Sequence, residues 1–434
     1  MKTTRLIPSN KLFRVCSLLP LLLLCSAVVH AANVNVDCGA GESLNAALAS
    51  LDPVGPHTIT VVGTCTENIS IDLHDRITIQ APNGQTATIQ AANANNTVVL
   101  ISSSRRIVLN RLIIRGGRNG VSINLGSDVN IHNSSIKENS AVGVLLTQST
   151  LNLDSSTIEN NSLTGLGAQT SSLANVGGTT AAQRVVITGN GTGVNVLESN
   201  VQLIGNYTVE NNVNFGFDVA GGRLNLVGNQ PEQENSISSN GGGINVRNGA
   251  SCIVFGQTAI ENNGSNGIIV SNGSNLTINE TVLPNATRLT TVIEGHSTAG
   301  LTVAQLGQVT LAGQHKITNN GASAATCIST VCGGIRVFSG SQLTLRGGTE
   351  ITANIGPGVT VEHHGTLLVN IPVVISGNTE EGIRQLIQSA LSILPSTTPT
   401  PGVNDISSVI CDNTSVIGGD LNVIVKVSCK VAKL

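Results

Sequence analysis

Side chains that could bind or transform a ligand are scarce in this chain, so the few that share a spacing are informative. The 434 residues include 25 acidic and 22 basic residues, five Phe, one Tyr and no Trp. Arg336 and Arg384 are 384 − 336 = 48 positions apart, Glu362 lies between them, and Phe338 follows Arg336 closely. Guanidinium groups bind carboxylates through paired hydrogen bonds, and an aromatic ring offers a sugar an apolar face. If the fold gathers these four side chains, they predict contacts to an acidic sugar.

An internal repeat of about 24 residues indicates how they would be gathered. Each unit opens with a glycine followed by alternating apolar residues, and a second alternating pair and a third apolar position follow. Successive opening glycines are 22 to 34 residues apart. They are Gly120, Gly143, Gly165, Gly193, Gly216, Gly243, Gly267, Gly300, Gly334, Gly358 and Gly382. An Asn, often paired as in Asn160-Asn161, closes most units.

Three short alternating strands per unit are typical of a β-solenoid, in which each coil pairs in parallel with the next. We expect the closing Asn to adopt the left-handed turn conformation and to bond its equivalent one coil away. We expect the opening glycine to supply similar backbone freedom. In the strand after each glycine, the first and third residues should point inward and the second and fourth outward. Arg336, Phe338, Glu362 and Arg384 then face outward on three consecutive coils.

The chain start completes a resemblance to a known family. Residues 43–51 are expected to form a short helix, with Ser43 as its N-cap and leucines on one face. A strand then leads into Gly63, Glu67 and Asn68. From about residue 40 to 390 the sequence resembles the right-handed parallel β-helix proteins of the pectin-lyase-like superfamily. The resemblance implies an all-β fold, which we predict to have about twelve coils and an N-terminal capping helix.

Many members of that superfamily cleave acidic polysaccharides, using clustered aspartates or Ca²⁺ beside an arginine. The outward positions counted from the glycines contain two carboxylates, Asp218 and Glu362, which are five coils or about 24 Å apart. Glycosidase carboxylates lie roughly 5–9.5 Å apart. We therefore predict no catalytic residues and no metal ligands.

A second acidic pair remains open. Glu261 and Glu294 fall on adjacent coils, where we expect a solvated polar face. Alternatively, the pair could raise one carboxyl pKa or hold a cation. No cofactor is expected, with Ca²⁺ left open. His296 stands where other coils have Asn, and is interpreted as a turn variant.

The termini indicate export. Residues 1–31 have the basic start, apolar run and small-residue end of a signal peptide, and predict a secreted, periplasmic or cell-surface protein. An exported chain permits disulfides, which we expect between Cys38 and Cys65, Cys327 and Cys332, and Cys411 and Cys429. Cys252 is expected to be a buried small hydrophobe.

The remaining organisation is predicted as a cap at 32–58, the β-helix at 59–394, a Pro/Thr-rich linker at 395–402 and a capping coil at 403–434. Without the signal, 22 − 4 = 18 basic residues face 25 acidic ones, so nucleic acid is excluded as a partner. No other apolar run is long enough to span a membrane. The sequence leaves the oligomeric state open.

We expect an exported, non-catalytic protein that binds a glycan, such as an acidic polysaccharide, or a cell-surface component along its side. The first alternative is a polysaccharide lyase or glycoside hydrolase with an unusual site. The second is a structural surface spine or adhesin-like protein, since one fold hosts many functions.

Overall fold

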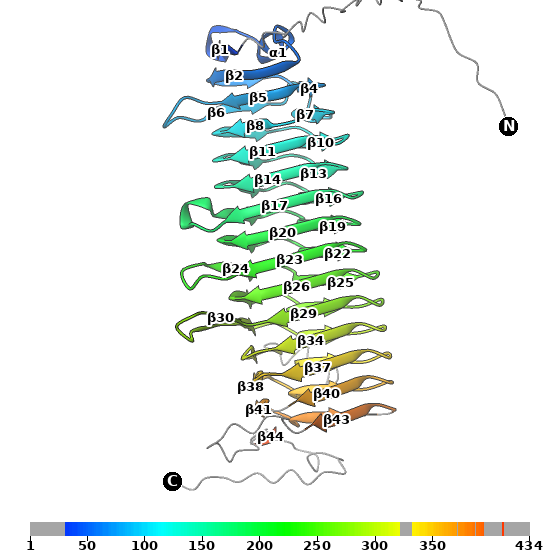
Figure 1. Ribbon diagram of the computed structural model, residues 1–434. Helices are drawn as coiled ribbons and strands as arrows, with labels where there is room; N and C mark the ends of the chain where they lie inside the picture. Colours follow the sequence, from blue (N-terminus) through cyan, green and yellow to red (C-terminus); the bar gives the residue numbers. More distant parts are fainter. Residues whose placement is uncertain (1–30, 322–331, 371, 387, 395–409, 412–434) are drawn as a thin grey trace, which may run out of the picture.

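Three long parallel β-sheets wind around one axis in the computed structural model, which describes residues 31–321, 332–370, 372–386, 388–394 and 410–411. Figure 1 shows the coils stacked into an elongated column, with the N-terminal coil at one end. Each complete coil contributes one strand to each of sheets A, B and C, in the chain order B, C, A, and the coils at the two ends are incomplete within the described residues. The architecture is a right-handed parallel β-helix, as predicted.

Sheet A contains 15 strands, counted over the described residues. They are β1 (Ala32–Asp37), β2 (Val54–Val62), β5 (Asp75–Gln80), β8 (Ile107–Asn110), β11 (Asp128–His132), β14 (Thr150–Asp154), β17 (Leu173–Gly178), β20 (Asn200–Gly205), β23 (Arg223–Gly228), β26 (Ser251–Gly256), β29 (Asn275–Asn279), β34 (Gln308–Ala312), β37 (Gln342–Arg346), β40 (Thr366–Asn370) and β43 (Ala390–Leu394).

Sheet B contains 14 strands within the same described ranges. They are β3 (Thr64–Thr66), β6 (Ala87–Gln90), β9 (Leu112–Arg115), β12 (Ser135–Lys137), β15 (Thr157–Glu159), β18 (Val185–Thr188), β21 (Tyr207–Glu210), β24 (Asn235–Ser238), β27 (Thr258–Glu261), β32 (Thr291–Glu294), β35 (Lys316–Thr318), β38 (Glu350–Thr352), β41 (Val374–Ser376) and β44 (Ile410–Cys411).

Sheet C contains 13 strands in the part of the chain that the structure describes. They are β4 (Ile69–Asp72), β7 (Val99–Ser102), β10 (Val121–Asn124), β13 (Val142–Thr147), β16 (Thr164–Gln169), β19 (Thr192–Leu197), β22 (Phe215–Ala220), β25 (Gly242–Arg247), β28 (Ile268–Val270), β33 (Ala299–Val303), β36 (Gly333–Val337), β39 (Val359–Val361) and β42 (Ile383–Gln385). A projecting hairpin adds β30 (Thr281–Val282) and β31 (Arg288–Leu289).

The register of sheet C confirms the outward rows predicted from the glycines. Thr302 pairs with Arg336, Arg336 pairs with Thr360, and Thr360 pairs with Arg384. The intervening residues, such as Ile335 and Val337, are buried in the core. Because residues alternate between the two faces of each strand, equivalent outward residues of successive coils form a straight row along the sheet.

The coil count is the part of the fold that differs from the prediction. The structure has about fifteen turns rather than about twelve, because 15 strands stack in sheet A. The early coils were undercounted because their sheet C strands lack the opening glycine. Val98 precedes β7, for example, and it is fully buried.

The core is aliphatic along the whole column. Stacked Ile, Val and Leu side chains of successive coils fill it, and Tyr207 and Phe217 are its largest fully buried side chains. Cys252 is buried between Leu224 and Leu276 of the flanking coils, and its thiol is free, as predicted. Each coil thus buries its apolar residues on its neighbours, so few aromatic residues are needed.

The paired asparagines divide two roles that were expected of one residue. The first Asn of a pair, such as Asn160 or Asn211, has a left-handed φ of 55°. The second is buried and forms a ladder: Asn212 Nδ2 donates to Asn240 Oδ1 at 2.8 Å, and the Asn190 backbone N–H donates to Asn212 Oδ1 at 3.0 Å. The ladder pairs buried turn amides that would otherwise lack partners.

The opening glycines are required for a different reason than expected. Their φ angles are not positive. A Cβ on Gly143 would instead lie 2.6 Å from the Gly165 carbonyl oxygen and 2.8 Å from Asn161 Nδ2. The glycine therefore gives the next coil and the Asn ladder room to approach the backbone.

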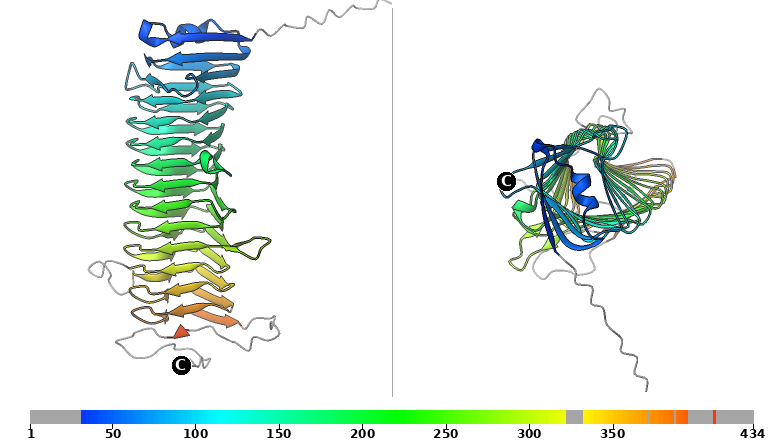
Figure 2. Two further views of the ribbon diagram at one scale, coloured as in Figure 1. Left: turned by 90° about the vertical axis from the view of Figure 1, so that its left-hand side faces the viewer. Right: turned by 90° about the horizontal axis from the view of Figure 1, so that it is seen from above.

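The N-terminal end is closed by helix α1 (Leu44–Ala49), which Figure 2 shows lying across the first coil. Ser43 is the N-cap, as predicted, and Leu44 and Leu48 are buried against the core. The short 3₁₀ segment η1 (Cys38–Ala40) precedes the helix, and η2 (Ala181–Gln183) lies in a later turn. The cap covers strand edges that would otherwise be open to other chains.

Several predictions concern residues outside the described ranges. The signal peptide, the linker at 395–402 and most of the capping coil at 403–434 lie outside them. The predicted pairs Cys327–Cys332 and Cys411–Cys429 each include a cysteine that is not described. The Cys38–Cys65 disulfide is present, as predicted.

Candidate functional site

The structure brings three of the four predicted contact residues into direct contact near the C-terminal end of sheet C. Arg336 donates to Glu362 Oε1 from Nε at 2.7 Å and from Nη2 at 2.6 Å. The guanidinium carbon of Arg336 also lies 4.2 Å from the centre of the Phe338 ring. Arg336 therefore covers one face of the ring that was predicted to stack on a sugar.

Glu362 occupies its predicted outward position but is only 3% exposed. Arg336 is the one arginine that bonds it among the described residues. A buried carboxylate that loses its cation becomes an uncompensated charge, which is strongly destabilising. The Arg336–Glu362 pair therefore has a structural role, whatever else it does.

Arg384 lies two coils beyond Arg336 and has carboxylate partners of its own. Its Nη2 lies 2.6 Å from Glu380 Oε2 and 2.5 Å from Glu381 Oε2. Both glutamates lie in the turn before β42, so counting along the strands did not reveal them. The sequence signal that could have found them is the i,i+3 and i,i+4 spacing of opposite charges before Arg384.

These pairings alter what the C-terminal cluster, defined as Arg336, Phe338, Glu362, Glu380, Glu381 and Arg384, can bind. Two arginines face three carboxylates, which gives a formal charge of 2 − 3 = −1. An incoming carboxylate would compete with carboxylates already in place. The arrangement suits hydroxyl groups, which both donate and accept hydrogen bonds, better than it suits a uronate.

The other predicted outward carboxylate is also paired. Asp218 accepts two bonds from Arg247, each 3.0 Å long, and one of 2.9 Å from Asn245 Nδ2. The Asp218 bond raises the pKa of Arg247. Asp218 and Glu362 are five strands apart in sheet C, or about 24 Å, so they cannot act on one glycosidic bond.

Glu261 and Glu294 are register partners on adjacent strands of sheet B, as the repeat predicted. Burial and the neighbouring Glu294 charge together raise the pKa of Glu261. Both side chains are half-buried on the outer face of that sheet. This pair of carboxylates lies on a different sheet from the C-terminal cluster.

His296 is a member of the Asn ladder, which confirms its interpretation as a turn variant. Its Nδ1 accepts the Asn263 backbone N–H at 3.1 Å, and its own backbone N–H donates to Asn320 Oδ1. Burial lowers the pKa of His296 to about 4. The ring is therefore neutral at pH 7 and has no exposed atoms for a ligand.

The sequence did not reveal a groove near the N-terminal end of sheet C, which is lined by residues of β4 and β7 and by the residues just before β10. Figure 1 shows where these three strands lie. Its volume is about 390 Å³. It is lined mainly by amide, hydroxyl and guanidinium side chains, namely Asn68, Ser70, Asn95, Asn96, Thr97, Arg118 and Asn119, with Ile69 and Leu100. All residues that line it precede Gly120, the first opening glycine, so the outward positions counted from the glycines do not include them.

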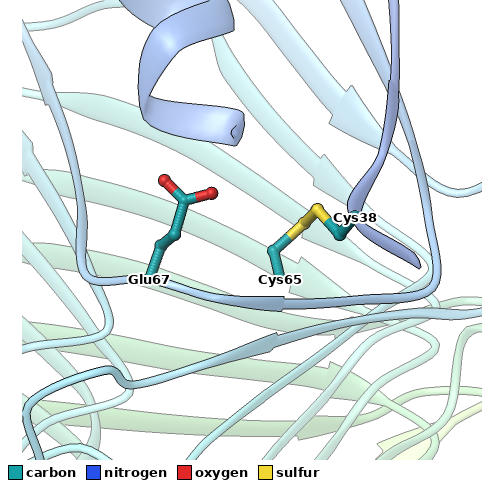
Figure 3. Close-up of side chains that lie close together, drawn as sticks. All are labelled: Cys38, Cys65 and Glu67. Carbon is teal, nitrogen blue, oxygen red and sulfur yellow. A yellow bond between two sulfur atoms is a disulfide. The ribbon is translucent and has the colours of Figure 1, made fainter. Parts of the chain in front are cut away.

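One further cluster lies at the N-terminal cap, where Cys38, Cys65 and Glu67 come within metal-ligand reach (Figure 3). The two sulfurs are joined in the disulfide, so they are not thiolate ligands. Glu67 instead accepts the Leu44 and Asn45 backbone N–H groups at 2.8 and 3.0 Å. The cluster closes the cap and is not a metal site.

Comparison with known proteins supports the fold. A family model described as the right handed beta helix region matches residues 172–349, which is less than half of the chain. No curated protein matches the sequence. No helix among the described residues combines the length and the hydrophobicity needed to cross a membrane.

Solved structures that are similar to this chain share little sequence with it. The Azotobacter vinelandii mannuronan C-5 epimerase AlgE6 A-module is 15% identical, with a TM-score of 0.45, over 79% of this chain and 91% of its own. Pectate lyase Pel9A is 12% identical, with a TM-score of 0.38, over 82% of this chain and 80% of its own. The predicted right-handed parallel β-helix fold is confirmed by the family model and by the stacked parallel sheets of the chain itself.

Proposed function

We propose that this protein is an exported, non-catalytic β-helix that binds a glycan along the outer face of sheet C. The proposal rests on one observation, which is that the carboxylates in the outward rows are already paired. Asp218 and Glu362 are both held in ion pairs with arginines of the same face. General acid–base catalysis needs a carboxyl group that is free to exchange a proton with the substrate.

The face also has features that suit a polymer of sugars. Its outward side chains are held at strand spacing by the paired backbones, so binding would order few protein groups. The C-terminal cluster offers Arg336, Phe338 and Arg384, which remain partly exposed. The Cys38–Cys65 disulfide fits an oxidising compartment outside the cytoplasm, where glycans are found.

The predicted contact residues of the C-terminal cluster are tested with variants that leave no buried charge without its partner. Replacing Arg336 alone would leave Glu362 buried and unpaired, so the double change Arg336→Gln with Glu362→Gln removes both charges together. Phe338→Ala removes the ring. Each variant is titrated with a panel of neutral and acidic polysaccharides, and its circular dichroism spectrum is compared with that of the parent.

A matched control exists on another face. Arg223 and Phe255 are exposed on sheet A, so Arg223→Gln with Phe255→Ala replaces one arginine and one phenylalanine away from sheet C. Weaker glycan binding by the sheet C variants and parental binding by the control support the proposal. Parental binding by all variants places the contact elsewhere.

The Glu261–Glu294 pair favours one alternative, a polysaccharide hydrolase or lyase. A raised carboxyl pKa beside a second carboxylate is a recurrent feature of such enzymes. Glu261→Gln and Glu294→Gln should leave glycan binding unchanged under our proposal. New reducing ends or unsaturated uronides that depend on these two residues would establish the alternative.

A further inference from the structure

The groove near the N-terminal end of sheet C has walls held in place by hydrogen bonds. Asn68 fixes the loop that forms one wall: its Nδ2 donates to the Asn93 and Thr97 carbonyls at 3.2 and 2.9 Å, and its Oδ1 accepts the Asn93 N–H at 2.7 Å. The Arg118 backbone N–H donates to the Asn96 carbonyl at 2.8 Å and joins the second wall to the first. The shape is therefore preformed.

The approach of the two walls depends on Gly117. A Cβ there would lie 2.6 Å from Val98 Cγ2 and 2.7 Å from the Asn96 carbonyl oxygen. Arg118 follows Gly117 directly and is the charged residue of the groove lining. Tight backbone packing at Gly117 thus positions the start of the Arg118 side chain.

Arg118 differs from the arginines of the C-terminal cluster. It is exposed, it lines the groove, and its guanidinium forms no ion pair with the described residues. Amide and hydroxyl groups of Asn95, Asn119 and Ser70 surround the opening. Leu100, from the outward row of sheet C, adds a half-buried apolar surface.

We propose that this groove binds a carboxylate-bearing sugar, with Arg118 paired to the carboxylate and the asparagine amides bonded to the hydroxyls. An unpaired guanidinium offers the two parallel donors that match a carboxylate. Leu100 contacts the apolar face of the sugar ring. This inference rests on the proposed glycan binding and names the class of sugar that one part of sheet C takes.

The groove is remote from the C-terminal cluster. Sheet C places β7 and β36 nine strand spacings apart, which is about 43 Å at about 4.8 Å per strand. Variants at one site therefore leave the other intact, and the two can be tested separately.

The test uses calorimetric titration of the full exported chain with hexagalacturonate, its methyl ester and neutral cellohexaose. Arg118→Gln is compared with Arg105→Gln, an exposed arginine of a neighbouring coil that lies outside the groove residues. Both variants lose one positive charge. Loss of a charged hydrogen-bond pair should weaken hexagalacturonate binding by about 10- to 100-fold in Arg118→Gln only.

A chemical footprint locates the contact independently of affinity. Phenylglyoxal modifies exposed arginines, and peptide mass mapping reports which are protected. Bound hexagalacturonate should protect Arg118 and leave Arg105 reactive, and the methyl ester should protect neither.

Three results would overturn the inference. They are parental hexagalacturonate binding by Arg118→Gln, an equal loss in Arg105→Gln, and an unprotected Arg118 in the footprint. If hexagalacturonate fails to bind but cellohexaose binds, the groove inference fails and glycan binding stands. If the polysaccharide panel also fails to bind, the proposed function fails with it.

Discussion

At the scale of single residues, most polar side chains near the turns stabilise the coil stack. The Asn ladder runs through the column, and its members are buried at 4% exposure or less, for example Asn139, Asn212 and Asn378. The same amide chemistry on the outer face of sheet A, as in Asn130, Asn152 and Asn175, is accessible to water. Burial, rather than residue type, decides how much each amide contributes.

Asn212→Ala should therefore lower the free energy of unfolding by about 3 kcal/mol, because it leaves buried ladder groups without partners. Chemical denaturation measures the loss. Asn152→Ala is the matched control, since its amide also bonds amides one coil away but lies on an accessible face. Equal losses in the two variants would contradict the role assigned to the buried ladder.

His296 should make stability depend on pH. Its pKa is lowered by burial from 6.5 to about 4, so below pH 6.5 the unfolded chain binds the proton more readily than the folded one. Stability is then fully retained above pH 6.5 and declines as the pH falls toward 4, by about 3 kcal/mol in total.

His296→Asn should restore the ladder residue of the neighbouring coils and reduce that decline. Denaturation midpoints of parent and variant at pH 7 and pH 4.5 provide the comparison. Part of the decline should persist, because burial also lowers the pKa of His315. An unchanged pH dependence in His296→Asn would show that the ring is not the responsible group.

At the scale of elements, the strand register could be predicted residue by residue, whereas the turns could not. An alternating strand has only two faces, so one glycine per coil sufficed to place Arg336, Thr360 and Arg384 in one row. Turn residues such as Glu380 and Glu381 follow no such rule, and they determine the charge of the C-terminal cluster. The groove was missed because its coils lie before or at the first opening glycine, and because turn residues such as Asn95 and Asn96 form part of its lining.

The N-terminal cap should depend on Glu67. Burial raises the pKa of Glu67, but hydrogen bonds from the Asn45 and Leu44 backbones and from Ser43 outweigh burial and hold it below 4.5. The stabilisation is thus present above pH 4.5 and is lost as the pH falls through the lowered value. Glu67→Gln should destabilise the cap by about 1–2 kcal/mol.

Hydrogen exchange measures this effect locally. Amides of α1 and β2 should exchange faster in Glu67→Gln than in the parent, while coils near β22 keep their protection, because a solenoid transmits stability mainly between neighbours. Glu232→Gln, at an exposed turn, is the control. Uniformly faster exchange along the column would contradict a local capping role.

At the scale of the whole molecule, the two proposed contact regions, the groove and the C-terminal cluster, lie on the same sheet but about 43 Å apart. A glycan long enough to reach both would bind the second region as an intramolecular event. A chain long enough to reach both regions should therefore bind more tightly than a short chain that reaches only one of them. Titration with size-fractionated polysaccharide that contains both acidic and neutral sugars tests this expectation, and Arg118→Gln should remove the added affinity of the long chains.

The measurement that most directly tests non-catalytic glycan binding detects bound glycan and cleavage products in the same sample. The purified chain is incubated with acidic and neutral polysaccharides, with and without Ca²⁺, and bound glycan is measured together with new reducing ends and unsaturated uronides. We predict saturable binding without either product. Products that accumulate with time and with protein concentration, or the absence of binding to every glycan, would contradict the account.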